Sequence, residues 1–232
     1  MNRAISFRSV LFLLLASGVS SLHAGDAHAA DANSAANWDG AYIGVLGGYN
    51  WVKDRTTEYL TATGADTGLV YNYRPDGLSG GLKAGVNFQA GQFVYGLEAD
   101  FEKTNIAGHF VDSGIGRGDD DIQWQSSIRA RMGLAADRFM IYGTGGIAFA
   151  SIKNTYTFLP TMVSESFTNV THGYTVGLGV DMAITDNVIG GLEFRHTEFA
   201  DKTNISTVAF PGLTGKQEPS SNAIRLSISY KF

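Results

Sequence analysis

The chain has 232 residues, among them 29 Gly, 4 Pro and no Cys, and it carries a formal net charge of −5 at pH 7. The absence of cysteine excludes disulfide bonds, thiolate zinc sites, iron–sulfur clusters and thiol nucleophiles. The negative charge balance offers no bulk basic surface to neutralise a phosphate backbone, so we expect no nucleic-acid partner.

The first thirty residues have the pattern of a secretory signal peptide. A basic start with Arg3 and Arg8 precedes the apolar run Val10–Val19, and an alanine-rich stretch follows. This order of charge, apolar core and small residues is typical of export signals. We therefore expect residues 1–30 to be a signal peptide and residues 31–232 to form one exported domain.

Apolar and polar residues alternate through most of the exported part, as in strands whose two faces meet different environments. The final segment is the clearest, because Ile224, Leu226, Ile228, Tyr230 and Phe232 alternate with charged or serine residues. The same pattern predicts strands over 41–51, 78–88, 93–102, 122–134, 139–151, 173–184, 188–199 and 222–232. In the segment 139–151 glycines blur the alternation, which leaves open whether Ile141 or Tyr142 faces outward.

The connections between these segments alternate in length. They span 52–77, 89–92, 103–121, 135–138, 152–172, 185–187 and 200–221, and every proline lies in a long one. Tight turns at one end and long loops at the other are typical of outer-membrane barrels, and proline is disfavoured in paired strands. The predicted fold class is therefore all-β: an eight-stranded antiparallel up-and-down transmembrane β-barrel with short periplasmic turns and long extracellular loops.

The polar face of the predicted strands mixes glycine and serine with charges of both signs, which suits a narrow lumen filled by side chains. Lys83 falls about opposite Glu98 across the turn 89–92, which predicts an ion pair. The side chains expected to form ion pairs in the lumen are Lys83, Glu98, Asp100, Glu102, Arg129, Arg131, Asp181, Glu193, Arg195 and Arg225. The apolar face is then expected to meet lipid; the alternative is a soluble, lipocalin-like barrel with an apolar cavity.

Aromatic residues gather near both ends of the predicted strands, as at the two headgroup levels of a bilayer. This distribution favours the membrane barrel over the soluble one. Towards the short turns the residues are Tyr42, Phe88, Phe93, Tyr95, Tyr230 and Phe232, and towards the long loops Tyr49, Trp51, Phe101, Trp124, Tyr174 and Phe194.

Several stretches resemble a known family. The ending 225–232, with a final Phe after alternating apolar residues, resembles the C-terminal assembly signal of bacterial outer-membrane proteins. Together with the preceding Ile224, the apolar residues of this signal here are Ile224, Leu226, Ile228, Tyr230 and Phe232. The stretches 38–44, 127–133, 142–148 and 185–195 are similar to the small alphaproteobacterial surface barrels, the RopB-type porin-like family. The resemblance covers essentially all of 38–232, although His196 stands where an aromatic residue is common.

This resemblance implies an eight-stranded barrel of the OmpA transmembrane type in a Gram-negative outer membrane, with roles in envelope integrity and host contact. The partners it implies are outer-membrane lipid and lipopolysaccharide, the outer-membrane assembly machinery, and host or surface ligands bound through the loops. Some relatives bind hemin, which makes the histidines of this chain relevant.

The chemistry-bearing residues are few. His109, His172 and His196 are predicted near the loop end, where imidazoles could bind hemin iron or another metal, although three unrelated surface histidines are the simpler interpretation. A catalytic serine requires a general base such as histidine at a fixed position beside it. The sequence gives no such relation between a histidine and Ser164, Glu165 or Ser166. The tripeptide 117–119, Arg-Gly-Asp, is expected to belong to a solvated loop.

The sequence therefore favours a non-catalytic surface barrel without catalytic residues, cofactor or metal. Its expected role is structural, in envelope integrity and in interaction with a host or the environment. The alternatives are a small porin-like channel and a surface protein that binds hemin or a metal.

Overall fold

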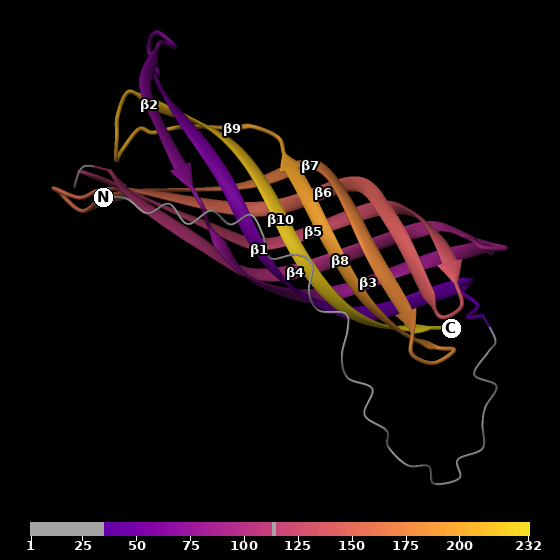
Figure 1. Cartoon of the computed structure of the whole chain (residues 1–232). Coiled ribbons are helices and arrows are strands. Elements are labelled where there is room, and N and C mark those ends of the chain that lie inside the picture. The colour runs from indigo at the N-terminus through magenta and orange to yellow at the C-terminus, as the bar shows by residue number, and fades with distance from the viewer. Residues whose placement is uncertain (1–34, 113–114) are drawn as a thin grey trace, which may run out of the picture. The chain divides into compact units, whose positions relative to one another are not determined.

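The computed structural model describes residues 35–112 and 115–232, and the predicted signal peptide lies outside the described residues. The described residues form ten strands (Figure 1), and among them no helix is long and apolar enough to cross a membrane. The strands are β1 Gly40–Leu60, β2 Asp66–Tyr73, β3 Asp76–Ala90, β4 Phe93–Asp112, β5 Gly116–Ala136, β6 Phe139–Phe158, β7 Val163–Ala183, β8 Val188–Phe199, β9 Lys202–Ile205 and β10 Leu213–Lys231.

The sheet of residues 35–232 closes on itself. Consecutive antiparallel pairs run β1-β3-β4-β5-β6-β7-β8-β10, and β10 then pairs back onto β1 from Tyr42 opposite Lys231 to Leu60 opposite Leu213. Such closure leaves no unpaired edge along this ring of strands. The all-β, antiparallel, up-and-down prediction is confirmed by this topology.

Two short strands lie outside this ring and were predicted as loop. Strand β2 pairs with the last residues of β1, and β9 pairs with the first residues of β10. The structure therefore has two strands more than the eight predicted, because the connections 52–77 and 200–221 contain paired strands of their own.

The long connections are also shorter than predicted, because the strands continue into them. Strands β6 and β7 remain paired up to Phe158 opposite Val163, so the predicted loop 152–172 is mostly β-ladder. Here Thr155 bonds Ser166 at 2.9 Å and Thr157 bonds Ser164 at 2.9 Å across the two strands. Polar residues on both faces end the alternation of hydropathy but not the backbone pairing, which is why the sequence pattern missed these extensions.

The opposite end of the barrel, which we call the turn end, is closed by tight connections as predicted. Gly91 has a φ of +63° in the turn between β3 and β4, a conformation that glycine adopts without steric cost. Asp137 has a φ of +51° in the turn between β5 and β6, and Asp is among the few other residues that tolerate this region. The other end, where the strands are extended, is called the loop end below.

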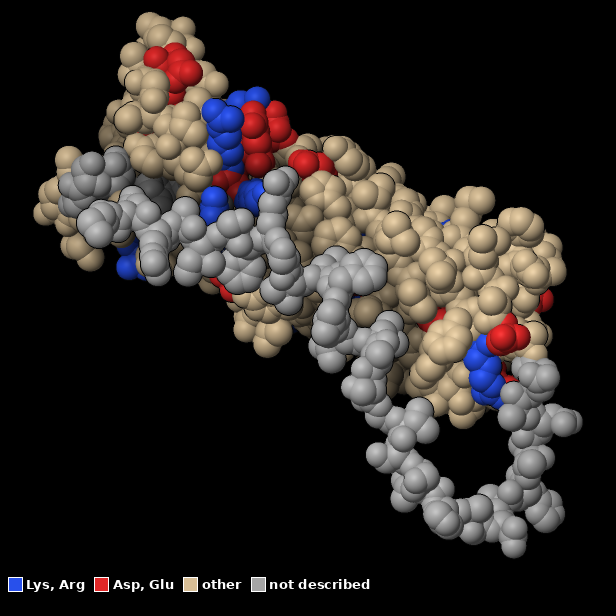
Figure 2. Space-filling model, in the orientation of Figure 1, with Lys and Arg blue, Asp and Glu red and all other residues tan. Residues whose placement is uncertain are grey.

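The apolar faces point outward. Leu82, Leu226 and Ile228 are each about 60% exposed, whereas Lys83 and Arg225 are buried. Ile141 is exposed and Tyr142 is buried, which answers the question left open by the glycines of β6. Figure 2 shows the resulting surface: on the face in view, charged side chains gather towards the two ends of the barrel, and the band between them is largely uncharged. The soluble alternative, with its apolar cavity, is thereby overturned.

One aromatic residue was assigned to the wrong face. Tyr42 is only 3% exposed and points into the lumen, whereas the belts of exposed rings on the outer face include Phe93, Tyr95 and Tyr174. The reason is the period of two itself: because Ile43 and Val45 face outward, Tyr42 must face inward.

Candidate functional site

The lumen of the barrel holds a cluster of buried charged side chains, which we call the lumen cluster. It combines five basic and five acidic residues: Lys83, Arg129, Arg131, Arg195 and Arg225 with Glu98, Asp100, Glu102, Asp181 and Glu193. These are the residues that the sequence placed in the lumen. Strands β3, β4, β5, β7, β8 and β10 supply them from alternate positions, so the strand period alone aims all of them inward.

Arg129 of β5 lies at the centre of the lumen cluster. Its guanidinium donates to Glu193 at 2.8 Å and 2.9 Å and to Asp100 at 3.0 Å, and it forms a further ion pair with Glu98. Thr144 of β6 accepts another hydrogen bond at 3.2 Å. One arginine thus connects three carboxylates from β4 and β8 across the lumen, in the forked geometry that guanidinium provides.

Glu98 connects this centre to the turn end of the lumen. It accepts from the hydroxyl of Tyr42 at 2.7 Å and lies 3.2 Å from the Nζ of Lys83. Lys83 stands opposite Asp100 in the ladder rather than opposite Glu98, so the predicted pair forms along a diagonal of the sheet. Arg131 lies 3.6 Å from Glu98 and pairs with Asp181 at 2.6 Å.

Towards the loop end, Glu102 takes the central position. Arg225 donates to it at 2.9 Å, the Nη1 of Arg195 lies 3.6 Å away, and the hydroxyl of Ser79 donates at 2.6 Å. Arg195 also pairs with Glu193 at 2.7 Å and thereby joins this group to the centre. The opposite charges and hydrogen bonds compensate the cost of burying so many ions, which would be large for any one alone.

Neutral residues in the lumen extend the network beyond the charged side chains. Gln125 of β5 donates to Asn50 of β1 at 3.2 Å, and Asn50 donates to Ser79 at 2.9 Å. Ser127 donates to Asp100 at 2.7 Å. Their inward positions follow from the same alternation that predicts the charged face of the strands.

Apolar layers close the lumen cluster on both sides. At the turn end lie Trp38, Val94, Ala135, Met140, Tyr142, Ala183 and Ile189. Towards the loop end a second layer, the apolar belt, consists of Val52, Ile106, Ile122, Ala148, Ala150, Ile152 and Phe199. The lumen cluster is therefore sealed from both ends of the barrel by packed side chains.

A cavity of about 220 Å³ opens at the loop end, beyond the apolar belt. Its lining is mixed, with Leu69, Phe210 and Leu213 beside Arg117, Tyr156 and Asn204. The Arg-Gly-Asp tripeptide 117–119 lies in strand β5 and not in a loop as expected. The side chains of Arg117 and Asp119 are ion-paired to each other at 2.6 Å.

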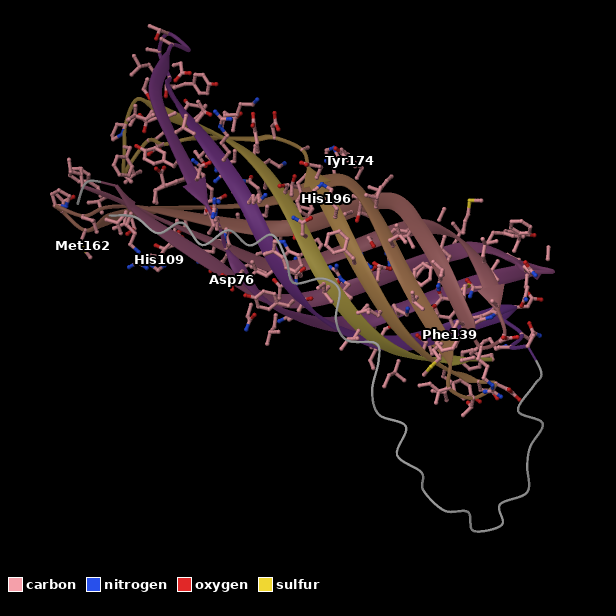
Figure 3. All side chains as sticks on the ribbon, in the orientation of Figure 1. Asp76, His109, Phe139, Met162, Tyr174 and His196 are labelled. Carbon is pink, nitrogen blue, oxygen red and sulfur yellow. The ribbon has the colours of Figure 1, made fainter. Side chains whose placement is uncertain are left out.

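The three candidate histidines are not brought together. His109 is on β4 and His172 on β7, both exposed, and His196 is on the outer face of β8. His196 contacts Asn222 at 2.9 Å and Glu198 at 3.3 Å. Figure 3 shows His109 towards the loop end and His196 nearer the middle of the barrel. In the described ranges no group of three His, Cys, Asp or Glu residues could hold a metal ion.

The serines weighed as nucleophiles have other partners. Ser164 and Ser166 bond the threonines of β6 described above, and Glu165 accepts from the hydroxyl of Ser206 at 2.9 Å and from that of Thr207 at 3.0 Å. These hydrogen bonds lower the pKa of Glu165, against the opposing effect of its burial. The arrangement ties β7 to the segment after β9.

Comparison with known proteins decides the family. The family model described as the outer membrane protein beta-barrel domain matches residues 12–232. The chain belongs to the outer-membrane β-barrel family. As a barrel of this family it is an outer-membrane protein.

Curated relatives of this barrel are themselves outer-membrane proteins. It is 32% identical over 200 residues to the 25 kDa outer-membrane immunogenic protein of Brucella canis, covering 84% of this chain and 80% of that one. It is 32% identical over 207 residues to the 22 kDa outer membrane protein of Rhizobium leguminosarum bv. viciae, covering 89% and 83%. The predicted resemblance to alphaproteobacterial surface barrels is thereby confirmed.

Solved structures share the fold. The outer membrane protein OprG of Pseudomonas aeruginosa matches with a TM-score of 0.53 at 13% identity, over 85% of this chain and 98% of that one. The outer membrane protease OmpT of Escherichia coli matches with a TM-score of 0.52 at 10% identity, over 86% and 99%. At such identities the likeness concerns the barrel alone and carries no activity from one protein to the other.

Proposed function

We propose that this protein is a non-catalytic barrel of the outer membrane with a structural role in envelope integrity, and that its loop end faces outward to contact a host or the environment. The observation that carries the proposal is the sealed lumen. The lumen cluster and the apolar layers on either side of it fill the barrel with packed side chains. A barrel of this width is filled by its own side chains and leaves no aqueous channel.

The loop end supports a role in surface contact. Strands of 20 or 21 residues, such as β5 and β6, far exceed the 9–11 residues that cross a bilayer. We call the largely uncharged band of the outer face, which we propose meets lipid, the lipid band. Beyond the outward-facing Trp51 of β1 come the exposed Lys53 and Arg55, so the barrel continues outside the lipid band with a hydrated outer face. The Brucella relative is named an outer-membrane immunogenic protein, which agrees with such an exposed part.

The orientation that we propose has the tight turns in the periplasm and the extended strands outside the cell. Outer-membrane barrels place short turns on the periplasmic side and their longer connections outside. Lipid and lipopolysaccharide would then surround the band, and the assembly machinery would bind the segment from Ile224 to Phe232. The outward-facing, exposed Ile228, Tyr230 and Phe232 are accessible for such binding.

The sealed lumen predicts that the protein does not conduct ions. Folded protein added to planar lipid bilayers is expected to give no reproducible single-channel steps under conditions in which a general porin conducts. A porin in the same bilayer is the control for membrane quality. Regular steps of uniform size would contradict the closed lumen and favour the small-channel alternative.

The structural role is tested by deleting the gene that encodes the protein. We expect the mutant cells to be more sensitive to detergent and to bind less to surface ligands, with unchanged uptake of small solutes. Restoring the wild-type protein should reverse both defects. Normal detergent resistance and normal surface binding, together with slower solute uptake, would overturn the proposal.

A further inference from the structure

Beyond the apolar belt, the inner face of the barrel carries two carboxylates that form no ion pair with a basic residue in the described part of the chain. Asp54 of β1 and Asp120 of β5 are 6% and 4% exposed. Both lie outside the lipid band, because their outward-facing neighbours are the charged Lys53 and Arg55 on β1 and Asp119 and Asp121 on β5.

These two carboxylates share one compartment. In the next polar layer towards the turn end, Gln125 of β5 reaches Asn50 of β1 directly across the lumen at 3.2 Å, so β1 and β5 are close at this level. The charge of Asp120 acts on Asp54, and both charges act on Tyr156 of β6. Asp54, Asp120 and Tyr156 therefore lie near one another at this level of the barrel.

At this end of the barrel three buried oxygen atoms have no hydrogen-bond partner among the described residues: Oδ1 of Asp54, Oδ2 of Asp120 and Oγ1 of Thr56, which is itself only 4% exposed. The other oxygen of Asp120 accepts from the amide of Asn154. Buried polar atoms are normally satisfied, and an unsatisfied one calls for an explanation such as an ion or a water.

The charges that face the two carboxylates are all acidic. The charges of Asp120 and Glu218 act on Asp54, and those of Asp119 and Asp121 on the outer face act on Asp120 through the strand. Arg117, which lines the loop-end cavity, is paired with Asp119, and Lys216 of the described loop end is paired with Asp201 and Glu218. In the lumen cluster, by contrast, every carboxylate contacts a lysine or an arginine.

We propose that Asp54, Thr56 and Asp120 bind a hard divalent cation, represented by calcium, inside the loop end of the barrel. Calcium takes six to eight oxygen ligands in flexible geometry and combines carboxylates with neutral oxygens and water. Two carboxylates and a hydroxyl supply part of that shell, and water completes it. The cation provides the positive charge that this compartment lacks.

The cavity at the loop end gives the ion a path. Thr56 lines this cavity and is also one of the three proposed ligands, and Tyr156 lines it as well. A cation entering from the loop end therefore reaches the carboxylates without crossing the apolar belt.

Without a cation, these groups retain protons more readily than exposed carboxylates. Burial, followed by the charge of Asp120, raises the pKa of Asp54 to about 7, and burial raises that of Asp120 to about 6. Calcium must displace these protons, so its affinity is expected to fall as the pH is lowered from 8 to 5.

The test is calorimetric titration of calcium chloride into folded, chelator-treated protein in detergent at pH 8. We expect one calcium ion per chain with a dissociation constant on the order of 10⁻⁴–10⁻³ M, as in extracellular calcium modules. The double variant D54N/D120N should bind at least tenfold more weakly. The matched control D119N/D121N removes the same charge from the outer face of the same region and should bind like the wild type.

Folding of each variant is checked by the difference in gel mobility between boiled and unboiled samples. If D54N/D120N does not fold, Thr56→Val replaces the unpartnered hydroxyl with an isosteric group and should weaken binding severalfold. Absence of calcium binding by the wild type at pH 8 would overturn the site. Equal weakening in the inner-face and outer-face double variants would also overturn it, because it would indicate diffuse attraction to the acidic loop end.

Discussion

Replacing Arg129 by methionine is expected to lower the free energy of unfolding by about 3–5 kcal/mol, the usual cost of removing one partner from a buried ion network. The side chain is 1% exposed and connects Glu98, Asp100 and Glu193. Methionine keeps much of the volume but leaves an uncompensated negative charge among buried carboxylates. Urea unfolding of the folded protein in detergent, followed by tryptophan fluorescence, measures the loss.

Two further variants separate charge from packing in this experiment. Adding Glu193→Gln to Arg129→Met makes the lumen neutral again, and part of the lost stability should return. Arg117→Met is the surface control, because its ion pair with Asp119 is exposed and should contribute less than about 1 kcal/mol. If Arg129→Met were as mild as Arg117→Met, the lumen cluster would not be what holds the interior of the barrel together.

The faces of the strands could be predicted from the sequence because one rule governs them. A period of two assigns each side chain to lipid or lumen as soon as one residue of the strand is assigned. Lys83 and Arg225, which the alternation predicts to point inward, are buried. Tyr42 was misplaced because its aromatic character was given more weight than its position beside the outward-facing Ile43.

The specific partners within the lumen could not be predicted in the same way. Lys83 contacts Glu98 along a diagonal, and Arg129 of β5 reaches Glu193 of β8 through the interior. Such contacts depend on the diameter and shear of the closed barrel, which no single strand encodes.

The loop end was predicted least well. Hydropathy alternates only where one face meets lipid, so the extensions of β6 and β7, with polar residues on both faces, appeared as loop. The compartment of Asp54 and Asp120 was missed for the same reason. The sequence places Asp120 in a predicted connection, as the middle one of three consecutive aspartates. Only the paired strand β5 shows that Asp120 points inward.

Replacing Gly146 by alanine is expected to destabilise the barrel by about 3 kcal/mol, at the upper end of the cost of overpacking. Gly146 of β6 stands opposite Arg129 of β5. A Cβ atom at this position would lie 2.1 Å from the carbonyl oxygen of Ile128 and 2.7 Å from the Cα of Arg129. Both are backbone atoms, so relief requires β5 to move and carries Arg129 away from its carboxylates.

The adjacent glycine offers a matched control within the same strand. Gly145 faces outward, and a Cβ atom there would meet nothing within 4 Å. Gly145→Ala should therefore leave stability unchanged or raise it by about 0.5–1 kcal/mol, since alanine loses less backbone entropy than glycine on ordering in a strand. A large loss of stability for Gly146→Ala and no loss for Gly145→Ala, measured by the same urea unfolding, is the expected result. Equal effects would mean that β5 and β6 are not as closely apposed beneath Arg129 as the barrel geometry requires.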